Sequence, residues 1–378
     1  MFRYLLATVT LGRSSFPYST SSASMISSST VAYLTNSCGL TPEKATSLSK
    51  LIEVRGAENA GSMFELLRSY GFTHNQLGEL VSRYPCYLLA DAETNLKPKM
   101  QYMVSMGISR DDLPQVLSNK WILSRNLKKH IVPTFEFLKE NIPSYGDLVV
   151  AIRRSAQLLR SKAREYMMLN MATLRAHGVP EKMIVKLMTK WSTSLMLKRD
   201  TFEEEVKRLL EYGFQPTSLN FVLGLSALAT QSKMNWKKKR ELFRLFGWSD
   251  EEFVSAFKVQ PMMMVTSEAK LRQMMEFFVG RLGLEPSQVA KCPNLFLVSL
   301  KKRVIPRCSV LQVLLSNGLI GRSDVRIITA LNSNSAHFTV KYLAPFQGVV
   351  PDLLEAYKGN VEFKGFSDEL LEPWNNHR

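Results

Sequence analysis

Apolar residues along this chain recur at helical spacing, in pairs of short stretches separated by a glycine. In residues 62–70 and again in residues 77–84, apolar side chains fall at positions i, i+3, i+4 and i+7, which predicts two amphipathic helices. Gly71 lies between them, where a glycine can end a helix in the left-handed conformation. Pro85 stops the second helix, and the short apolar run 86–90 follows.

The same arrangement recurs at a fixed period. A glycine followed by an apolar residue is found at Gly71, Gly107, Gly178, Gly213, Gly247, Gly283 and Gly318. Successive gaps are 36, 71, 35, 34, 36 and 35 residues, and the gap of 71 equals two periods with the glycine replaced at Asn141-Ile142. One short helix pair cannot bury its apolar faces alone, but stacked copies can. The period therefore predicts an all-α solenoid of about eight repeats.

A proline followed by an apolar cluster recurs after the second helix of several repeats. Pro85 and Pro261 each lie 14 residues after a periodic glycine, and Pro293 lies 10 residues after one. We interpret the break and the cluster as a third, short helix tucked under the helix pair. The proline is absent from the repeats at Ala156, Trp191 and Ala227. There we expect an irregular third helix.

The N-terminal segment differs from the repeats in composition. Its first 42 residues contain no Asp or Glu, carry Arg3 and Arg13, and are rich in serine and threonine. This composition is typical of a mitochondrial or chloroplast transit peptide, and we favour the mitochondrion. The alternative is a disordered tail without a targeting role. We expect a disordered transit peptide at 1–35 that is removed, a repeat domain at 36–345 and a C-terminal tail at 346–378.

Charge and the lack of known motifs narrow the function. The net charge of +16 favours an anionic polymer or surface as a partner. No apolar run approaches the roughly 18 residues of a membrane span. The four cysteines are scattered without a CxxC pair, and neither a metalloprotease motif nor a nucleotide-binding glycine loop is present. We therefore expect no enzyme activity, no metal and no cofactor.

Basic residues gather at one phase of the repeat, where each first helix begins. The set comprises 20 of the 49 Lys and Arg residues: Lys97, Lys99, Arg125, Lys128, Lys129, Arg160, Lys162, Arg164, Lys198, Arg199, Lys233, Lys237, Lys238, Lys239, Arg240, Lys270, Arg272, Lys301, Lys302 and Arg303. Residues at one phase of a solenoid share one edge, so we predict a positive stripe that contacts phosphates and carries little sequence information. The alternative is that these are ordinary solvated helix starts.

Several segments in phase with the glycines resemble the mitochondrial transcription termination factor (mTERF) family, in its plant branch. They are Tyr84-Pro85-Cys-Tyr-Leu-Leu, Leu96-Lys-Pro-Lys, Met103-Val-Ser-Met-Gly107, Pro293-Asn-Leu-Phe, Lys341-Tyr-Leu-Ala-Pro and Val350-Pro-Asp-Leu-Leu-Glu-Ala-Tyr357. The resemblance covers nearly all of the chain after the transit segment. It implies a right-handed superhelix of three-helix repeats whose basic inner groove holds double-stranded nucleic acid. It also implies a role in organellar transcription termination or initiation, or in RNA processing.

Two other functions fit a helical repeat protein. A pentatricopeptide-type reader of single-stranded RNA has a similar period, but its two-helix repeats have no use for the mid-repeat prolines and the third apolar segment. A protein-binding scaffold would need no positive stripe. We expect a monomer that binds double-stranded DNA or RNA of the organelle, with organellar transcription or RNA-processing proteins as further partners and no membrane contact.

Overall fold

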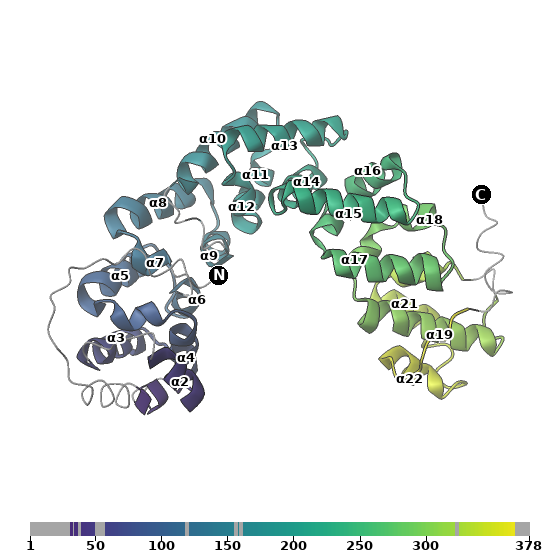
Figure 1. Cartoon of the computed structure of the whole chain (residues 1–378), viewed down its shortest axis with the longest axis horizontal. Helices are drawn as coiled ribbons and strands as arrows, with labels where there is room; N and C mark the ends of the chain where they lie inside the picture. Colours follow the sequence, from purple (N-terminus) through teal and green to yellow (C-terminus); the bar gives the residue numbers. More distant parts are fainter. Residues whose placement is uncertain are drawn as a thin grey trace. The chain divides into compact units, whose positions relative to one another are not determined.

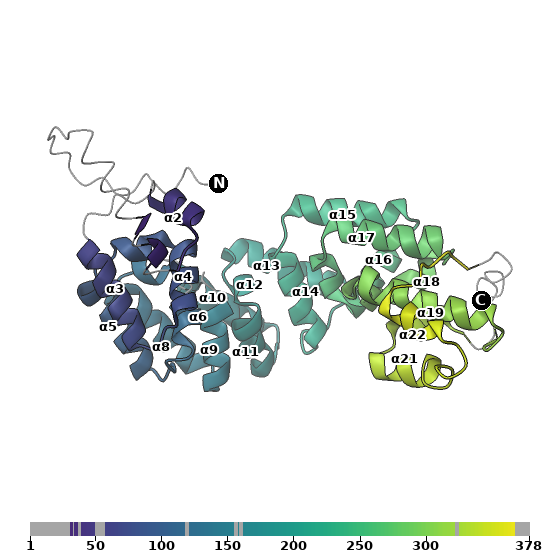
Figure 2. The same ribbon diagram turned by 90° about the horizontal axis from the view of Figure 1, so that it is seen from below.

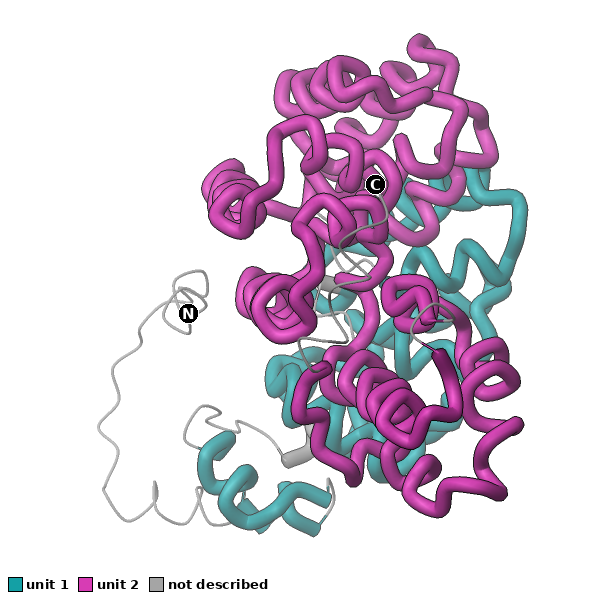
Figure 3. Tube along the Cα trace, turned by 90° about the vertical axis from the view of Figure 1, so that its right-hand side faces the viewer, with its two compact units in different colours: residues 1–161 teal, residues 162–378 magenta. Residues whose placement is uncertain are grey.

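The computed structural model describes residues 31–32, 34–36, 39–49, 57–117, 121–154, 158, 162–321 and 325–366. These residues form helices and no strand (Figure 1), which confirms the all-α prediction. The chain divides into two compact units, Met1–Ser161 and Lys162–Arg378 (Figure 3). Apart from four of its last five positions, the predicted transit peptide lies outside the described residues.

The first unit contains successive repeats built from a first helix, a second helix and a short third helix (Figure 2). After α2 (Pro42–Ser49), its elements are α3 (Ala57–Ser69), α4 (His74–Arg83) and the 3-10 helix η1 (Pro85–Leu89); the π-helical turn η2 (Ala92–Leu96), α5 (Lys97–Ser105), α6 (Leu113–Leu117) and α7 (Trp121–Ser124); and η3 (Leu127–Ile131), α8 (Val132–Asn141) and α9 (Tyr145–Arg154). The predicted third helix near Ala156 lies outside the described residues.

The second unit continues the pattern. Its elements are α10 (Ala163–Ala176), α11 (Glu181–Lys190) and α12 (Ser192–Leu195); α13 (Arg199–Glu211) and α14 (Leu219–Ala229); α15 (Lys233–Leu245), α16 (Asp250–Val259) and η5 (Pro261–Val265); α17 (Glu268–Met275) with η6 (Glu276–Arg281), α18 (Pro286–Ala290) and η7 (Pro293–Leu297); η8 (Leu300–Val304) with α19 (Ile305–Ser316), and α20 (Ile327–Asn332); then α21 (Ser335–Tyr342) and α22 (Asp352–Lys358).

The periodic glycines set the ends of the first helices. All seven have positive φ angles, between 62° and 93°. At the first of them, the Gly71 amide donates to the Arg68 carbonyl at 2.9 Å and the next amide donates to the Leu67 carbonyl at 3.2 Å, the bond pair of a Schellman helix end. At the skipped position, Ile142 has a φ of −119°, so that helix ends without a left-handed residue. The register predicted from the glycines is confirmed.

The mid-repeat prolines begin the third helices, as predicted. Pro85, Pro261 and Pro293 each open a 3-10 helix of 5 residues. The repeat at Trp191 has a regular α-helix there instead, α12. Ala227 lies inside α14, and the described residues of that repeat include no third helix. The apolar α14 packs against η5 of the following repeat instead.

Part of the segment predicted as a C-terminal tail packs on the second unit. Helix α22 packs against α19, and Phe363 and Phe366 beyond it are buried. The Arg281 guanidinium donates a hydrogen bond to the Phe363 carbonyl, and the Gln312 side chain donates to the Gly365 carbonyl at 2.8 Å. Residues 352–366 therefore cover α19, which is the first helix of its repeat.

Candidate nucleic-acid interface

Side-chain caps fix where several first helices begin. The side chains of Asp91, Asn126, Ser232, Ser267 and Ser299 each accept a hydrogen bond from the amide three residues later, over 2.7, 2.9, 3.2, 3.3 and 3.1 Å. Such caps satisfy amides that have no partner inside the helix. The basic residues that follow therefore lie in, or one turn beyond, the first turn of each helix.

Six lysines of the predicted stripe are exposed and form no ion pair with any described residue: Lys128, Lys129, Lys237, Lys238, Lys301 and Lys302. Lys237 and Lys238 lie in the second turn of α15, whereas the other four lie in the first turn of their helices, where the N-terminal end carries a partial positive charge and cations are electrostatically unfavourable. Helix stability therefore gives no reason for these four lysines, whereas an anionic partner does. Lys162, Arg164 and Lys198 are also exposed without an ion pair among the described residues.

A second group of the predicted residues forms ion pairs at the surface. The pairs are Lys97–Glu93 at 2.5 Å, Arg199–Glu203 at 2.8 Å, Lys233–Glu204 at 3.0 Å, Arg240–Asp250 at 2.9 Å and Arg272–Glu268 at 3.4 Å. Pairs this exposed contribute about 0–1 kcal/mol each. A phosphate could replace these carboxylates at little cost, so these five residues stay candidates. Lys270 is half-buried and forms no ion pair among the described residues.

Lys99 and Lys239 do not point to solvent, which corrects their assignment to the interface. Their exposed fractions are 5% and 6%. The Lys99 ammonium donates to the Leu123 carbonyl at 2.8 Å, and the Lys239 ammonium donates to the Met264 carbonyl at 2.6 Å and to Gln231 Oε1 at 2.7 Å. Burial lowers the pKa of Lys99 to about 8 and also lowers the pKa of Lys239. Both lysines hold the short third helix of their own repeat.

The sequence analysis did not recognise that these two lysines occupy a position at which a hydrogen-bond donor recurs. At the matching place in α10 and α19, Asn170 donates to the Leu195 carbonyl at 2.9 Å and Arg307 donates to the Ala330 carbonyl at 2.9 Å. The four polar residues Lys99, Asn170, Lys239 and Arg307 are spaced by 71, 69 and 68 residues, about two periods each. A donor at this place satisfies carbonyls at the end of the short helix, which have no partner inside it. The spacing was visible in the sequence, but the acceptors were not.

The other predicted residues divide as follows. Arg125 is half-buried. Arg303 is half-buried too, and its guanidinium donates to the Ser333 carbonyl. Arg160 lies outside the described residues.

A second set of exposed basic residues, also missed, lies at the ends of the second helices. They are Arg83, Arg153, Arg154, Lys190, Lys258 and Lys291. For Arg83, Lys190, Lys258 and Lys291 the signal in the sequence is a basic residue one to three positions before the Pro or Trp that follows the second helix, whereas no Pro or Trp follows Arg153 and Arg154 there. A cation also stabilises a helix C-terminus, which is reason enough for most of them.

Among the described residues, neither a metal-binding group nor a membrane-spanning helix is found. Within them, no group of three or more His, Cys, Asp or Glu side chains is placed to hold a metal ion. A search of the same residues finds no helix with the length and hydropathy of a membrane span.

Comparison with known families agrees with this architecture. A family model described as mTERF matches residues 64–226 and residues 222–339, about three quarters of the chain. The chain belongs to the mTERF family. The mTERF family binds nucleic acid and is not a family of enzymes. The two matches meet inside α14, the second helix of the repeat without a third helix. No curated protein sequence gives a significant match.

Proposed function

We propose that this mTERF protein binds double-stranded nucleic acid in an organelle and regulates transcription or RNA processing there. This proposal rests on six exposed lysines in the first or second turn of three first helices, and helix stability does not explain the four that lie in the first turn. Two of the lysine pairs occupy the second and third positions after the cap, and Lys237 and Lys238 lie three residues further along, so a cationic pair recurs near the start of the first helix in three repeats, as expected for a partner with regularly spaced phosphates. The polymer is duplex DNA or structured RNA, and the protein acts as a monomer.

The repeat architecture favours this proposal over the two alternatives. Pentatricopeptide-type repeats have two helices, whereas η1, η5 and η7 are third helices that begin at Pro85, Pro261 and Pro293. A scaffold that binds only proteins gives no reason for unpaired lysines at helix N-termini.

The targeting half of the proposal rests on the acid-free N-terminal segment. We propose the mitochondrion, with the chloroplast as the alternative, and membership of the plant branch of the family. A fluorescent fusion of residues 1–60 should enter one of the two organelles, and cytosolic fluorescence would refute the targeting claim.

The decisive experiment for the function is crosslinking of the tagged protein in isolated organelles, followed by sequencing of the bound nucleic acid. We expect enrichment of discrete organellar DNA or structured RNA regions over a tag-only control. Enrichment of single-stranded RNA alone would favour the pentatricopeptide-type alternative. Recovery of no nucleic acid above the control would favour the scaffold.

A further inference from the structure

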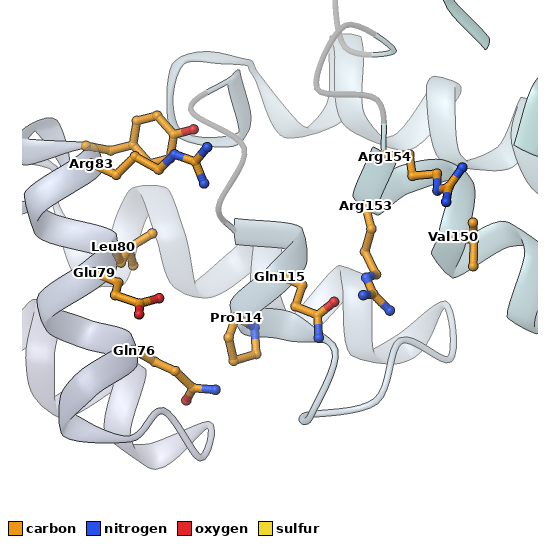
Figure 4. A pocket seen from close by; sticks show the side chains of 10 residues that line it. Gln76, Glu79, Leu80, Arg83, Pro114, Gln115, Val150, Arg153 and Arg154 are labelled. Carbon is orange, nitrogen blue, oxygen red and sulfur yellow. The ribbon is translucent and has the colours of Figure 1, made fainter. Parts of the chain in front are cut away.

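A cleft in the first unit combines an apolar floor with three arginines, and none of them belongs to the predicted stripe. It has a volume of about 570 Å³ and lies across α4, α6 and α9, the second helices of three successive repeats (Figure 4). Leu80, Pro114 and Val150 form its apolar part, and Arg83, Arg153 and Arg154 stand around it.

The three arginines form few close polar contacts with the described residues of the chain. The Arg83 guanidinium lies 5.8 Å from the centre of the Tyr84 ring. Arg153 approaches the Asp112 carboxylate only to 3.9 Å, and Asp112 also accepts a hydrogen bond from Ser109 Oγ at 2.8 Å. Arg154 is exposed and forms no ion pair with any described residue. Among the described residues of the lining, Glu79 is the only acidic one, and their ionised side chains sum to +2.

The size and shape of the cleft favour a narrow occupant. A volume of about 570 Å³ lies within the usual range of roughly 300–1,000 Å³ for pockets that hold a small ligand. A duplex is much wider and could only lie across the mouth, leaving the apolar floor empty. An extended strand of protein or of single-stranded nucleic acid could enter.

Three features favour a peptide over a single-stranded nucleic acid. Stacking platforms for bases are open aromatic faces, but Tyr84, the one aromatic ring among the described residues of the lining, is half-buried and lies against the Arg83 guanidinium. The Glu79 carboxylate faces the cleft (Figure 4) and repels a continuous run of phosphates. Arginine is the cation suited to planar carboxylates and to partly buried pairs, whereas eight of the nine exposed stripe residues without an ion pair are lysines, Arg164 being the exception.

We propose that the cleft of α4, α6 and α9 docks an acidic segment of a partner protein, in which carboxylates flank apolar side chains. The apolar side chains fill the floor at Leu80, Pro114 and Val150. The carboxylates pair with Arg83, Arg153 and Arg154, and Arg153 exchanges its long contact with Asp112 for a closer one. None of these residues belongs to the predicted stripe, so the proposal does not depend on the nucleic-acid interface.

The test measures binding of a labelled peptide to the full chain by fluorescence anisotropy. The probe is a fluorescein-labelled nonapeptide in which two leucines are each flanked by glutamates, and the control peptide has glutamine at every glutamate. The wild-type chain should bind the acidic peptide at least roughly tenfold more tightly than the glutamine peptide, since three favourable charge pairs of modest strength are lost together. Equal binding of the two peptides would overturn the proposal.

Matched variants locate the site. The triple variant Arg83→Gln, Arg153→Gln, Arg154→Gln should lose roughly tenfold in peptide affinity and keep its affinity for duplex DNA. The control Lys128→Gln, Lys129→Gln removes two charges of the same unit from the stripe, and it should keep peptide affinity and lose duplex affinity. A loss of peptide binding in the control as large as in the arginine variant would show general charge attraction only.

A second variant keeps the test valid if the triple variant fails to fold. Glu79→Gln removes the one negative charge among the described residues of the lining, so it should bind the acidic peptide about two- to fivefold more tightly than wild type. Unchanged or weaker binding would count against the cleft. If a single-stranded oligonucleotide displaces the peptide and binds more tightly, the occupant is nucleic acid and the proposal is wrong.

Discussion

The cluster at the start of α15 should separate into residues that stabilise the fold and residues that bind nucleic acid. Four consecutive cations, Lys237 to Arg240, follow the first turn of this helix, which begins at Lys233 after its cap at Ser232. The side chains of Lys237 and Lys238 are exposed, whereas Lys239 is 6% exposed. We predict that Lys239→Met lowers the free energy of unfolding and leaves duplex binding intact. Lys237→Gln with Lys238→Gln should do the reverse.

The size of the stability effect follows from the contacts of Lys239. Its ammonium donates to the Met264 carbonyl at 2.6 Å and to Gln231 Oε1 at 2.7 Å. Hydrogen bonds from a charged group contribute about 1.5–3 kcal/mol. Two effects reduce the loss: methionine no longer requires a charge to be buried, and Gln231 still donates to the Met264 carbonyl. We therefore expect a net loss of about 1–2 kcal/mol.

Urea denaturation and duplex titration of the same variants measure the two effects. Lys237→Gln with Lys238→Gln should change the unfolding free energy by no more than about 0.5 kcal/mol and lower the slope of log K against log salt by about 0.9 per lost phosphate contact. Lys239→Met should keep the wild-type slope. The reasoning is refuted if Lys239→Met is as stable as wild type, or if its salt slope falls as far as that of the double variant.

Three further predictions concern the fold. Gly213 has a φ of +76°, so Gly213→Val should lower the free energy of unfolding, measured by thermal denaturation, by about 1–3 kcal/mol. Gly61 lies in α3, where an added Cβ meets no atom within 4 Å, so Gly61→Ala should stabilise the fold by about 0.5–1 kcal/mol. Equal losses from the two changes would contradict the assigned register. Gly224→Ala places a Cβ 2.8 Å from Leu209 Cδ2 and should cost about 1–3 kcal/mol; a stability equal to wild type would show that Leu209 moves freely. The pKa of Lys99 is lowered to about 8, so the folded chain loses this proton before the unfolded chain does and stability should rise with pH between about 8 and 10.5. Between pH 7.5 and pH 9.5, the free energy of unfolding of wild type should rise by about 2 kcal/mol more than that of Lys99→Met. An equal pH dependence of the two proteins would refute this prediction.

The repeat and its register were predictable because they follow from local chemistry. A glycine that ends a helix and a proline that begins a short one act on their own neighbours, so the positive φ at Gly213 and the 3-10 helix at Pro261 could be read from spacing. The lost third helix near Ala227 was less predictable. It depends on how α14 packs against η5 of the following repeat, and that contact is long-range.

The candidate interface was less predictable than the fold, for a physical reason. Spacing places a lysine on a repeat phase but does not show whether its side chain turns outward. Lys237 and Lys239 are two residues apart, and successive helical residues point 100° apart around the axis, so one lies in solvent and the other under the short helix. The carbonyl of Met264, which draws Lys239 inward, is contributed by the third helix and is invisible in the pattern of charges.

The salt dependence of duplex binding tests the central claim most directly. The variant replaces with Gln six of the exposed lysines that form no ion pair with any described residue: Lys128, Lys129, Lys237, Lys238, Lys301 and Lys302. The account predicts weaker binding to all duplex sequences alike, and a slope of log K against log salt reduced by about 0.9 for each lost contact, up to roughly 5 in total. The helical circular dichroism should be unchanged. A folded variant with the affinity and salt slope of wild type would contradict the account.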